Sequence, residues 1–216
     1  MDSSNRSSTP NLFDLFIHPR RFFSHLDALK GRLPLIAAIW LMGLVRTLDR
    51  IDSRIAKAEL TNDLSLLRTL EVIAGSWSVF WPLIMAISAL GGWLIWLLWG
   101  WWFHRRVVLC GAIDAKRSVA RRVFTYSSLV VGLPYLLLLL FWTVRYESYL
   151  SAYDQEIFGS ILIVCLVFWE LFVAYCAVRT VFSVDRWRAR FWFIISPAIV
   201  YLVQFGLLAL IYASVG

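Results

Sequence analysis

Residues 74–103 read AGSWSVFWPLIMAISALGGWLIWLLWGWWF, thirty residues in a row without a charged side chain. About 20 apolar residues suffice for an α-helix to cross the hydrocarbon core of a bilayer, so this stretch is long enough to span a membrane. Its tryptophans form two groups, Trp77 and Trp81 near the start and Trp99 to Trp102 near the end, which is the distribution expected at two membrane interfaces. Gly91-Gly92 leaves two alternatives open, one tilted helix or a helix with a break. Together with Ser88, the glycine pair also offers a patch of small residues that another helix can approach closely.

Four further apolar segments share this character, and Glu170 is the one charged residue within them. They lie at 33–45, 123–144, 157–178 and 191–213. The segment 33–45 is short for a span, and its length equally suits a re-entrant or interfacial piece. Of all 216 residues 60% are hydrophobic and 16% charged, against about 45–50% and about 25% in soluble domains. This composition excludes a soluble globular enzyme and predicts an all-α, polytopic membrane helical bundle.

The distribution of Lys and Arg favours five spans over four. With five spans, residues 1–32, 104–122 and 179–190 share one side of the membrane and hold 5, 6 and 4 basic residues. The other side holds 46–73 and 145–156, with 5 and 1 basic residues. A four-span arrangement would instead place eleven basic residues on one side and ten on the other, which is no clear preference. Because cytoplasmic loops carry the excess of positive charge, we expect a cytosolic amino terminus and an extracytoplasmic carboxyl terminus.

Three segments outside these spans have recognisable patterns. Residues 1–10 are polar and predict a disordered cytosolic tail, and residues 11–32 predict an interfacial amphipathic helix with Arg20 and Arg21 near lipid phosphates. Apolar residues recur at helical spacing through 46–73, which predicts an extracytoplasmic helical hairpin.

The loop 104–122 has six basic residues and one acidic residue between two spans. Two interpretations stay open, a simple topology signal or the specific binding of anionic lipid headgroups or of a partner. Nucleic acid is not expected, because the basic residues flank spans and the aromatic residues belong to the bilayer. We expect no metal site and no cofactor. The candidate residues for lipid headgroups are Arg20, Arg21, Arg105, Arg106, Lys116, Arg117, Arg121 and Arg122.

Glu170 is the candidate for an intramembrane polar site. A carboxylate at the centre of a span is costly, so such a residue usually faces the bundle interior and often marks a functional site. Tyr201 and Gln204 of the last span are the expected hydrogen-bond partners, and either a packing role or a proton or substrate role is open. Pro134 and Pro197 predict kinks in the third and fifth spans.

Several short motifs resemble the bacterial branch of the Yip1-domain family. They are FIHPRRFF at 16–23 before the first span, RVFTYS at 122–127, and Gly132-Leu133-Pro134 within the third span. The resemblance implies an all-helical, five-span fold in the bacterial inner membrane with the amino terminus in the cytosol. Eukaryotic relatives are linked with vesicle traffic and small GTPases, but the DLYGP-type segment of those relatives is missing here, so GTPase binding is not carried over.

Two functional hypotheses follow. The first is a non-enzymatic membrane protein that organises lipid or recruits partners, either another membrane protein or a second copy of itself. It rests on the basic interfacial residues and on the lack of any catalytic motif. The second is a small transporter or lipid translocator in which Glu170 couples protons.

Overall fold

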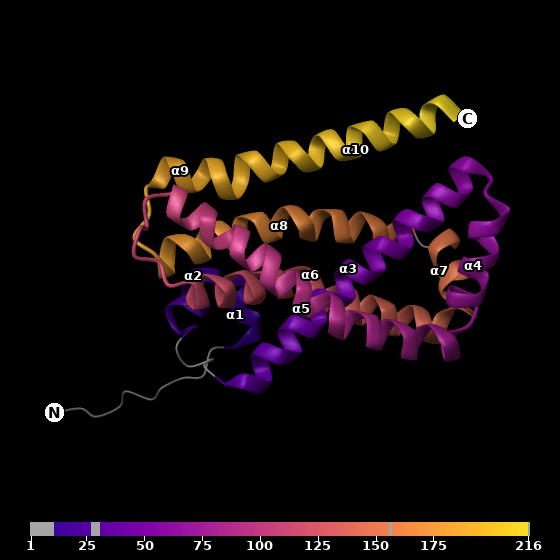
Figure 1. The fold of residues 1–216 in the computed structure, drawn as a ribbon, viewed down its shortest axis with the longest axis horizontal. Coiled ribbons are helices and arrows are strands. Elements are labelled where there is room, and N and C mark those ends of the chain that lie inside the picture. The colour runs from indigo at the N-terminus through magenta and orange to yellow at the C-terminus, as the bar shows by residue number, and fades with distance from the viewer. Residues whose placement is uncertain (1–10, 27–30, 156, 216) are drawn as a thin grey trace.

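The computed structural model describes residues 11–26, 31–155 and 157–215, and every regular element in these ranges is a helix (Figure 1). The expected tail at 1–10 lies outside the described residues. The helices are α1 (Leu12–Ile17), α2 (Pro19–Ser24), α3 (Arg32–Thr61), α4 (Leu64–Ala74), α5 (Trp77–Leu109), α6 (Arg117–Arg145), α7 (Tyr149–Gln155), α8 (Ile157–Val181), α9 (Arg186–Arg190), the π-helix η2 (Phe191–Ile195) and α10 (Ser196–Val215).

Within the described ranges, four segments are long and apolar enough to cross a membrane. They are Trp77–Leu109, Arg117–Arg145, Ile161–Val181 and Arg186–Leu207, the last of which joins α9, η2 and the start of α10. Their outer faces are apolar as well: Leu90 of α5 is 73% exposed and Leu210 of α10 is 69% exposed. Exposed apolar faces of this extent suit lipid rather than water as the surrounding medium. The chain is therefore an all-helical, multi-pass membrane protein.

α3 unites the apolar run at 33–45 and the charged segment after it in one continuous helix. Its charged second half distinguishes it from the four candidate spans. It ends where Asn62 adopts a left-handed conformation, and Asp63 then caps α4 by accepting hydrogen bonds from the backbone N–H groups of Ser65 and Leu66. The chain thus reverses direction at Thr61-Asn62-Asp63, the position at which turn-forming residues interrupt the apolar pattern.

α3 crosses α5 at a point where both backbones are almost in contact. A Cβ atom on Gly43 would lie 2.1 Å from the Ser88 carbonyl oxygen, and a Cβ on Gly92 would lie 2.4 Å from the Ile39 carbonyl oxygen. The close helix approach expected at Ser88 and Gly91-Gly92 is found at Ser88 and Gly92, whereas a Cβ on Gly91 would meet nothing closer than Thr47 Oγ1 at 3.9 Å. α5 runs without interruption from Trp77 to Leu109, so the glycine pair does not break the helix.

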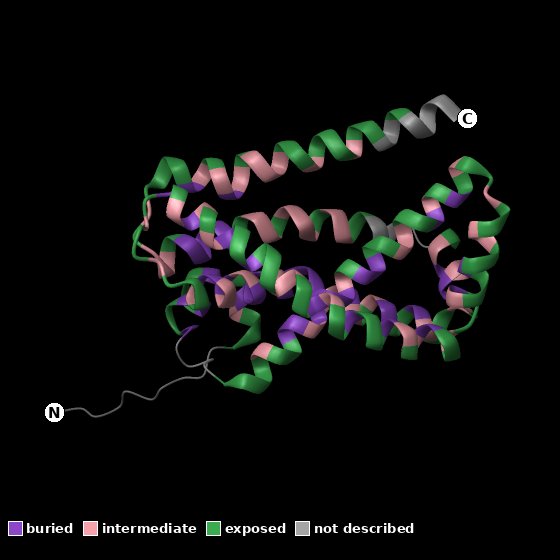
Figure 2. Cartoon of the chain, viewed as in Figure 1, coloured by how far each residue is buried: buried purple, intermediate pink, exposed green. Residues whose placement is uncertain are grey.

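In its described part, residues 11–26, the amino-terminal segment differs from the single helix expected over 11–32. It forms two six-residue helices, α1 and α2, separated at His18 (φ −128°, ψ 60°), because Pro19 disfavours a helical conformation at the residue before it. Leu15, Phe22 and Phe23 are buried in the protein core instead of in lipid, and α2 packs against α8. Figure 2 shows this end of the bundle rich in buried residues, whereas α10 has mainly exposed and intermediate ones.

A π-helical turn connects α9 to α10. The Ser196 N–H bonds to the Phe191 carbonyl in the i→i+5 pattern, but Pro197 has no N–H to continue this pattern to the Trp192 carbonyl. The guanidinium of Arg106, from the end of α5, donates to that carbonyl and lies 4.3 Å from the centre of the Phe193 ring. One side chain of α5 thus compensates for the donor that Pro197 lacks. α10 has its main contacts with η2 and α8.

Candidate functional site

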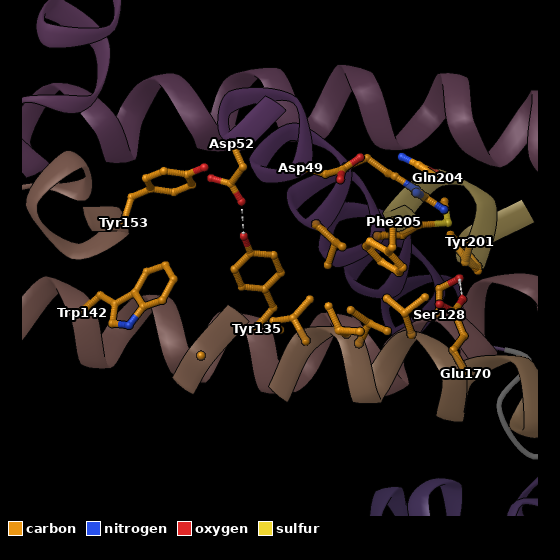
Figure 3. Close-up of a pocket in the computed structure, with 18 of the residues that line it drawn as sticks. Asp49, Asp52, Ser128, Tyr135, Trp142, Tyr153, Glu170, Tyr201, Gln204 and Phe205 are labelled. Carbon is orange, nitrogen blue, oxygen red and sulfur yellow. Dashed lines mark hydrogen bonds between the residues drawn. The ribbon is translucent and has the colours of Figure 1, made fainter. Parts of the chain in front are cut away.

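Polar side chains from α3, α6, α7, α8 and α10 line a cavity of about 270 Å³ (Figure 3). Its walls are otherwise apolar, with Val131, Ile163 and Val167 among the residues that form them. The polar and charged lining residues are Arg46, Asp49, Asp52, Ser128, Tyr135, Tyr153, Glu170, Tyr201 and Gln204.

One end of the cavity is formed around Glu170 of α8. The Ser128 hydroxyl of α6 donates to Glu170 Oε1 at 2.9 Å, because α6 and α8 pack side by side. The expected hydrogen-bond partners Tyr201 and Gln204 line the same cavity, but the bond goes to Ser128, so the expected pairing is wrong. α10 contacts α8 through aromatic rings: the ring centroids of Tyr201 in α10 and Phe168 in α8 are 6.3 Å apart.

The other end is formed around Asp52, which lies in α3 beyond the apolar run. The Tyr135 hydroxyl donates to Asp52 Oδ2 at 2.9 Å, and the Tyr149 hydroxyl donates to Oδ1 at 2.5 Å. Burial and, more weakly, the neighbouring Asp49 charge raise the pKa of Asp52, the hydrogen bonds from Tyr149 and Tyr135 lower it, and the net pKa is about 6. Asp52 is therefore ionised at pH 7.5, and two phenols stabilise its charge.

Aromatic packing at the ends of α5 and α6 positions Tyr149. Its ring stacks on Phe80 at 4.5 Å between centroids and contacts the edges of Trp77 and Trp142. The Trp77 indole in turn donates to the Tyr146 carbonyl at 2.8 Å, which holds the chain just before α7. Burial raises the pKa of Tyr149 well above its ordinary value, so its hydroxyl stays protonated and remains a donor to Asp52.

Acidic side chains outnumber basic ones in the cavity lining. The described lining includes three acidic side chains, of Asp49, Asp52 and Glu170, and a single basic side chain, Arg46. The charge of Arg46 acts on Glu170, whereas the charge that acts on Asp52 is that of Asp49, which repels it.

The contribution of α3 to this site was not predicted. Residues from Arg46 onward are charged, and the sequence pattern therefore placed them outside the membrane, away from Glu170. The available signal was the three-residue spacing of Arg46, Asp49 and Asp52, which lie on one face of a helix. Ser128 and Tyr135 gave no signal, because isolated hydroxyl residues are common in apolar helices.

Most headgroup candidates are exposed at one end of the bundle, where α2, the end of α5 and the start of α6 meet (Figure 1). The exposed members are Arg20, Arg21, Arg105, Lys116 and Arg117, and Arg122 is half-buried. Arg20 and Arg21 border a shallow groove that also contacts His18, Phe172 and Cys176.

The remaining two headgroup candidates, Arg106 and Arg121, contact other helices of the bundle and are not exposed. Arg106 bonds to the Trp192 carbonyl, as described above. The Arg121 guanidinium lies 4.6 Å from the centre of the Trp96 ring, and Nη2 lies 3.4 Å from the Leu97 carbonyl oxygen. Both side chains therefore hold α5 against a neighbouring element.

No group of three or more metal-ligating side chains comes together in the part of the chain that the structure describes. Cys110 and Cys176 are buried free thiols, and Cys165 is an exposed one.

Comparison with known proteins identifies a family for almost the whole chain. The model of the Yip1 domain matches residues 13–208. No curated protein and no solved structure matches the sequence. The matched range covers most of the chain and includes α3, α6, α8 and all polar residues of the cavity. Because the match extends over so much of the chain, the protein belongs to the Yip1 domain family.

Proposed function

We propose that this Yip1-family protein crosses the membrane five times, with α3 as the first crossing. Gly43 lies against Ser88 and Gly92, near the middle of α5, so α3 passes through the same layer as the apolar centre of that span. The carboxyl end of α5 and the amino end of α6, which are both basic, then face the cytosol together with the amino terminus. The hairpin 46–73 and the carboxyl terminus are extracytoplasmic. The location that goes with this arrangement is the bacterial inner membrane.

The proposed role is to bind anionic lipid headgroups at the cytosolic end and thereby to organise lipid or to recruit partner proteins. The observation that carries this role is the grouping of exposed Arg20, Arg21, Arg105, Lys116 and Arg117 at one end of the bundle. Leu12, Phe13 and Ile17 of α1 are exposed beside them and suit insertion at the lipid interface. The apolar outer faces suit a second membrane protein or a second copy as partner. The proposed role is non-enzymatic, in keeping with the lack of a recognised catalytic motif in the sequence.

Titration of the detergent-solubilised protein with fluorescent phosphatidylglycerol and phosphatidylcholine tests this proposal. Phosphatidylglycerol is expected to bind more tightly, and the double variant Arg20→Gln/Arg21→Gln is expected to bind it about 30-fold more weakly. Each basic residue near an anionic surface contributes about 1 kcal/mol, and about 1.4 kcal/mol corresponds to a factor of ten.

The matched control is Arg50→Gln/Arg54→Gln, which removes two exposed arginines from α3 in the hairpin segment. Its affinity for phosphatidylglycerol should equal that of the wild type. Equal binding of both lipids, or equal losses in both double variants, would contradict a headgroup site at this end.

A second candidate function is proton-coupled transport, favoured by the position of Glu170 on a cavity that also reaches Asp52. Proteoliposomes with an internal pH dye are then expected to show proton flux under an imposed pH gradient. Glu170→Gln should lower this flux at least tenfold, because an amide takes up no proton, while Glu71→Gln in α4 should not. Absence of flux, or the same flux in wild type and Glu170→Gln, would remove this candidate.

A further inference from the structure

α10 belongs to the least enclosed of the four candidate spans. Of the most apolar 18-residue window in Arg186–Leu207, 6% is buried inside the protein, against 22% in Trp77–Leu109, 50% in Arg117–Arg145 and 33% in Ile161–Val181. A Cβ atom on Gly206 would meet no heavy atom of the described residues within 4 Å. Figure 1 shows α10 diverging from α8 toward its carboxyl end. Elements with few buried apolar contacts move most readily, so α10 can move relative to the bundle.

The π-helical turn before α10 is fixed to α5. The Arg106 guanidinium donates to the Trp192 carbonyl, and the ring centroids of Phe103 and Phe193 are 5.0 Å apart. Pro197 follows this anchor and has no N–H, so one backbone hydrogen bond is missing where α10 begins. Prolines and π-helical turns are the places at which helices bend. The turn is therefore a hinge between an anchored segment and a loosely held helix.

α10 also brings a polar side chain without a partner to the cavity. Tyr201, Gln204 and Phe205 of α10 line the cavity (Figure 3). Gln204 is exposed, and its amide has no hydrogen-bond partner among the described residues. It lies about 21 Å along the helix axis from Arg190, well inside a hydrocarbon layer about 30 Å thick. An unsatisfied amide is unfavourable there, so this position of α10 is stable when water or a bound molecule fills the cavity.

From these observations we propose that α10 is a hinged wall of the cavity, which swings about the turn at 191–197. In the outward position the carboxyl end of α10 stands away from α8, and the cavity is open between the two helices toward the lipid. In the inward position α10 lies along α8, and the Gln204 amide is enclosed among the polar lining side chains. A molecule that binds the open cavity alone shifts the populations toward the outward position. The movement depends neither on headgroup binding at Arg20 and Arg21 nor on proton transport.

Double electron–electron resonance on the full chain in phosphatidylglycerol nanodiscs tests the movement. Spin labels are attached to Leu90→Cys in α5 and Leu207→Cys in α10, both exposed positions, after the three native cysteines have been replaced by alanine. Leu207 lies roughly 18 Å beyond Ile195, so a swing of about 20° moves it by about 6 Å. We expect two distance populations separated by about that amount. A single narrow distance for this pair would overturn the proposal.

A second label pair serves as the matched control for the position of the hinge. It keeps the label at Leu90 and places the other at Trp187 of α9, an exposed residue on the anchored side of the turn. This pair should give one narrow distance, because α9 and the turn stay on α5 while α10 moves. Two populations in this pair as well would mean that the movement does not begin at the turn, and would overturn the proposal.

The variant Pro197→Ala tests the hinge itself. Alanine restores an N–H to the turn, so the backbone hydrogen bonds can continue into α10 and stiffen the junction. We expect the labels at Leu90 and Leu207 to lose most of their second distance population. Pro134→Ala, the matched change inside α6, should leave both populations as they are in the wild type. An unchanged distribution in folded Pro197→Ala, or the same change in both variants, would overturn the proposal.

Discussion

Gly43→Ala and Gly92→Ala are each expected to destabilise the protein by about 1–3 kcal/mol, the range for overpacking a tight interface. The new methyl group would lie 2.1 Å from the Ser88 carbonyl oxygen in the first variant and 2.4 Å from the Ile39 carbonyl oxygen in the second. Backbone atoms cannot move aside as a flexible side chain can, so α3 and α5 would have to separate. Thermal unfolding in mild detergent, followed by circular dichroism, measures the loss.

Gly91→Ala is the matched control, because it changes the adjacent residue of the same helix. Its methyl group would meet nothing closer than Thr47 Oγ1 at 3.9 Å. Alanine is favoured over glycine within a helix by about 1 kcal/mol, so this variant should be as stable as the wild type or slightly more stable. Similar melting temperatures for all three variants would contradict the close crossing of α3 and α5.

Asp52→Ala is expected to be the most destabilising change in the cavity, by about 2–5 kcal/mol. It removes the acceptor of two enclosed hydroxyls, of Tyr135 and Tyr149, and each unsatisfied polar group costs about 1–3 kcal/mol. Asp49→Ala, one turn away on the same helix at an exposed position, should change stability by less than about 0.5 kcal/mol.

The cost of Asp52→Ala should also depend on pH. The pKa of Asp52 is about 6 in the folded protein, above its ordinary value of 3.8. The folded state therefore binds the proton more tightly, and the stability that Asp52 contributes is fully present below 3.8 and falls as pH rises through 6. The cost of Asp52→Ala should be larger at pH 5 than at pH 8, by roughly 1 kcal/mol. Unfolding midpoints of both proteins at the two pH values measure this difference, and a cost that grows with pH would contradict the enclosed position of Asp52.

Local signals in the sequence were sufficient for the helical class, the family and the long apolar helices. The uncharged run at 74–103 lies almost wholly within α5, and the Arg122–Ser127 and Gly132–Pro134 motifs lie within α6. These features depend on side-chain polarity along one helix, which a single sequence shows directly.

Features that depend on how helices are placed against one another were not predictable. Tyr135 and Tyr149 lie 83 and 97 residues from Asp52, and their meeting results from the path of α3 across the bundle. Arg106 turns inward to the carbonyl of Trp192, which lies 86 residues later in the chain. That carbonyl has no backbone donor because Pro197 lacks an N–H. The pairing of Glu170 with Ser128 depends on which helix packs along α8, and several hydroxyl residues were equivalent candidates.

The π-helical turn at Phe191–Ile195 determines the rotational phase of α10. Successive residues of an α-helix are related by about 100° around the axis. Loss of one residue from this turn would let ordinary α-helical bonding run from α9 into α10, and every later side chain would rotate by that angle. Tyr201 and Gln204 would then point away from Glu170 while the helix itself stayed intact. The presence of α10 side chains in the cavity thus depends on the residue count of one irregular turn outside the cavity.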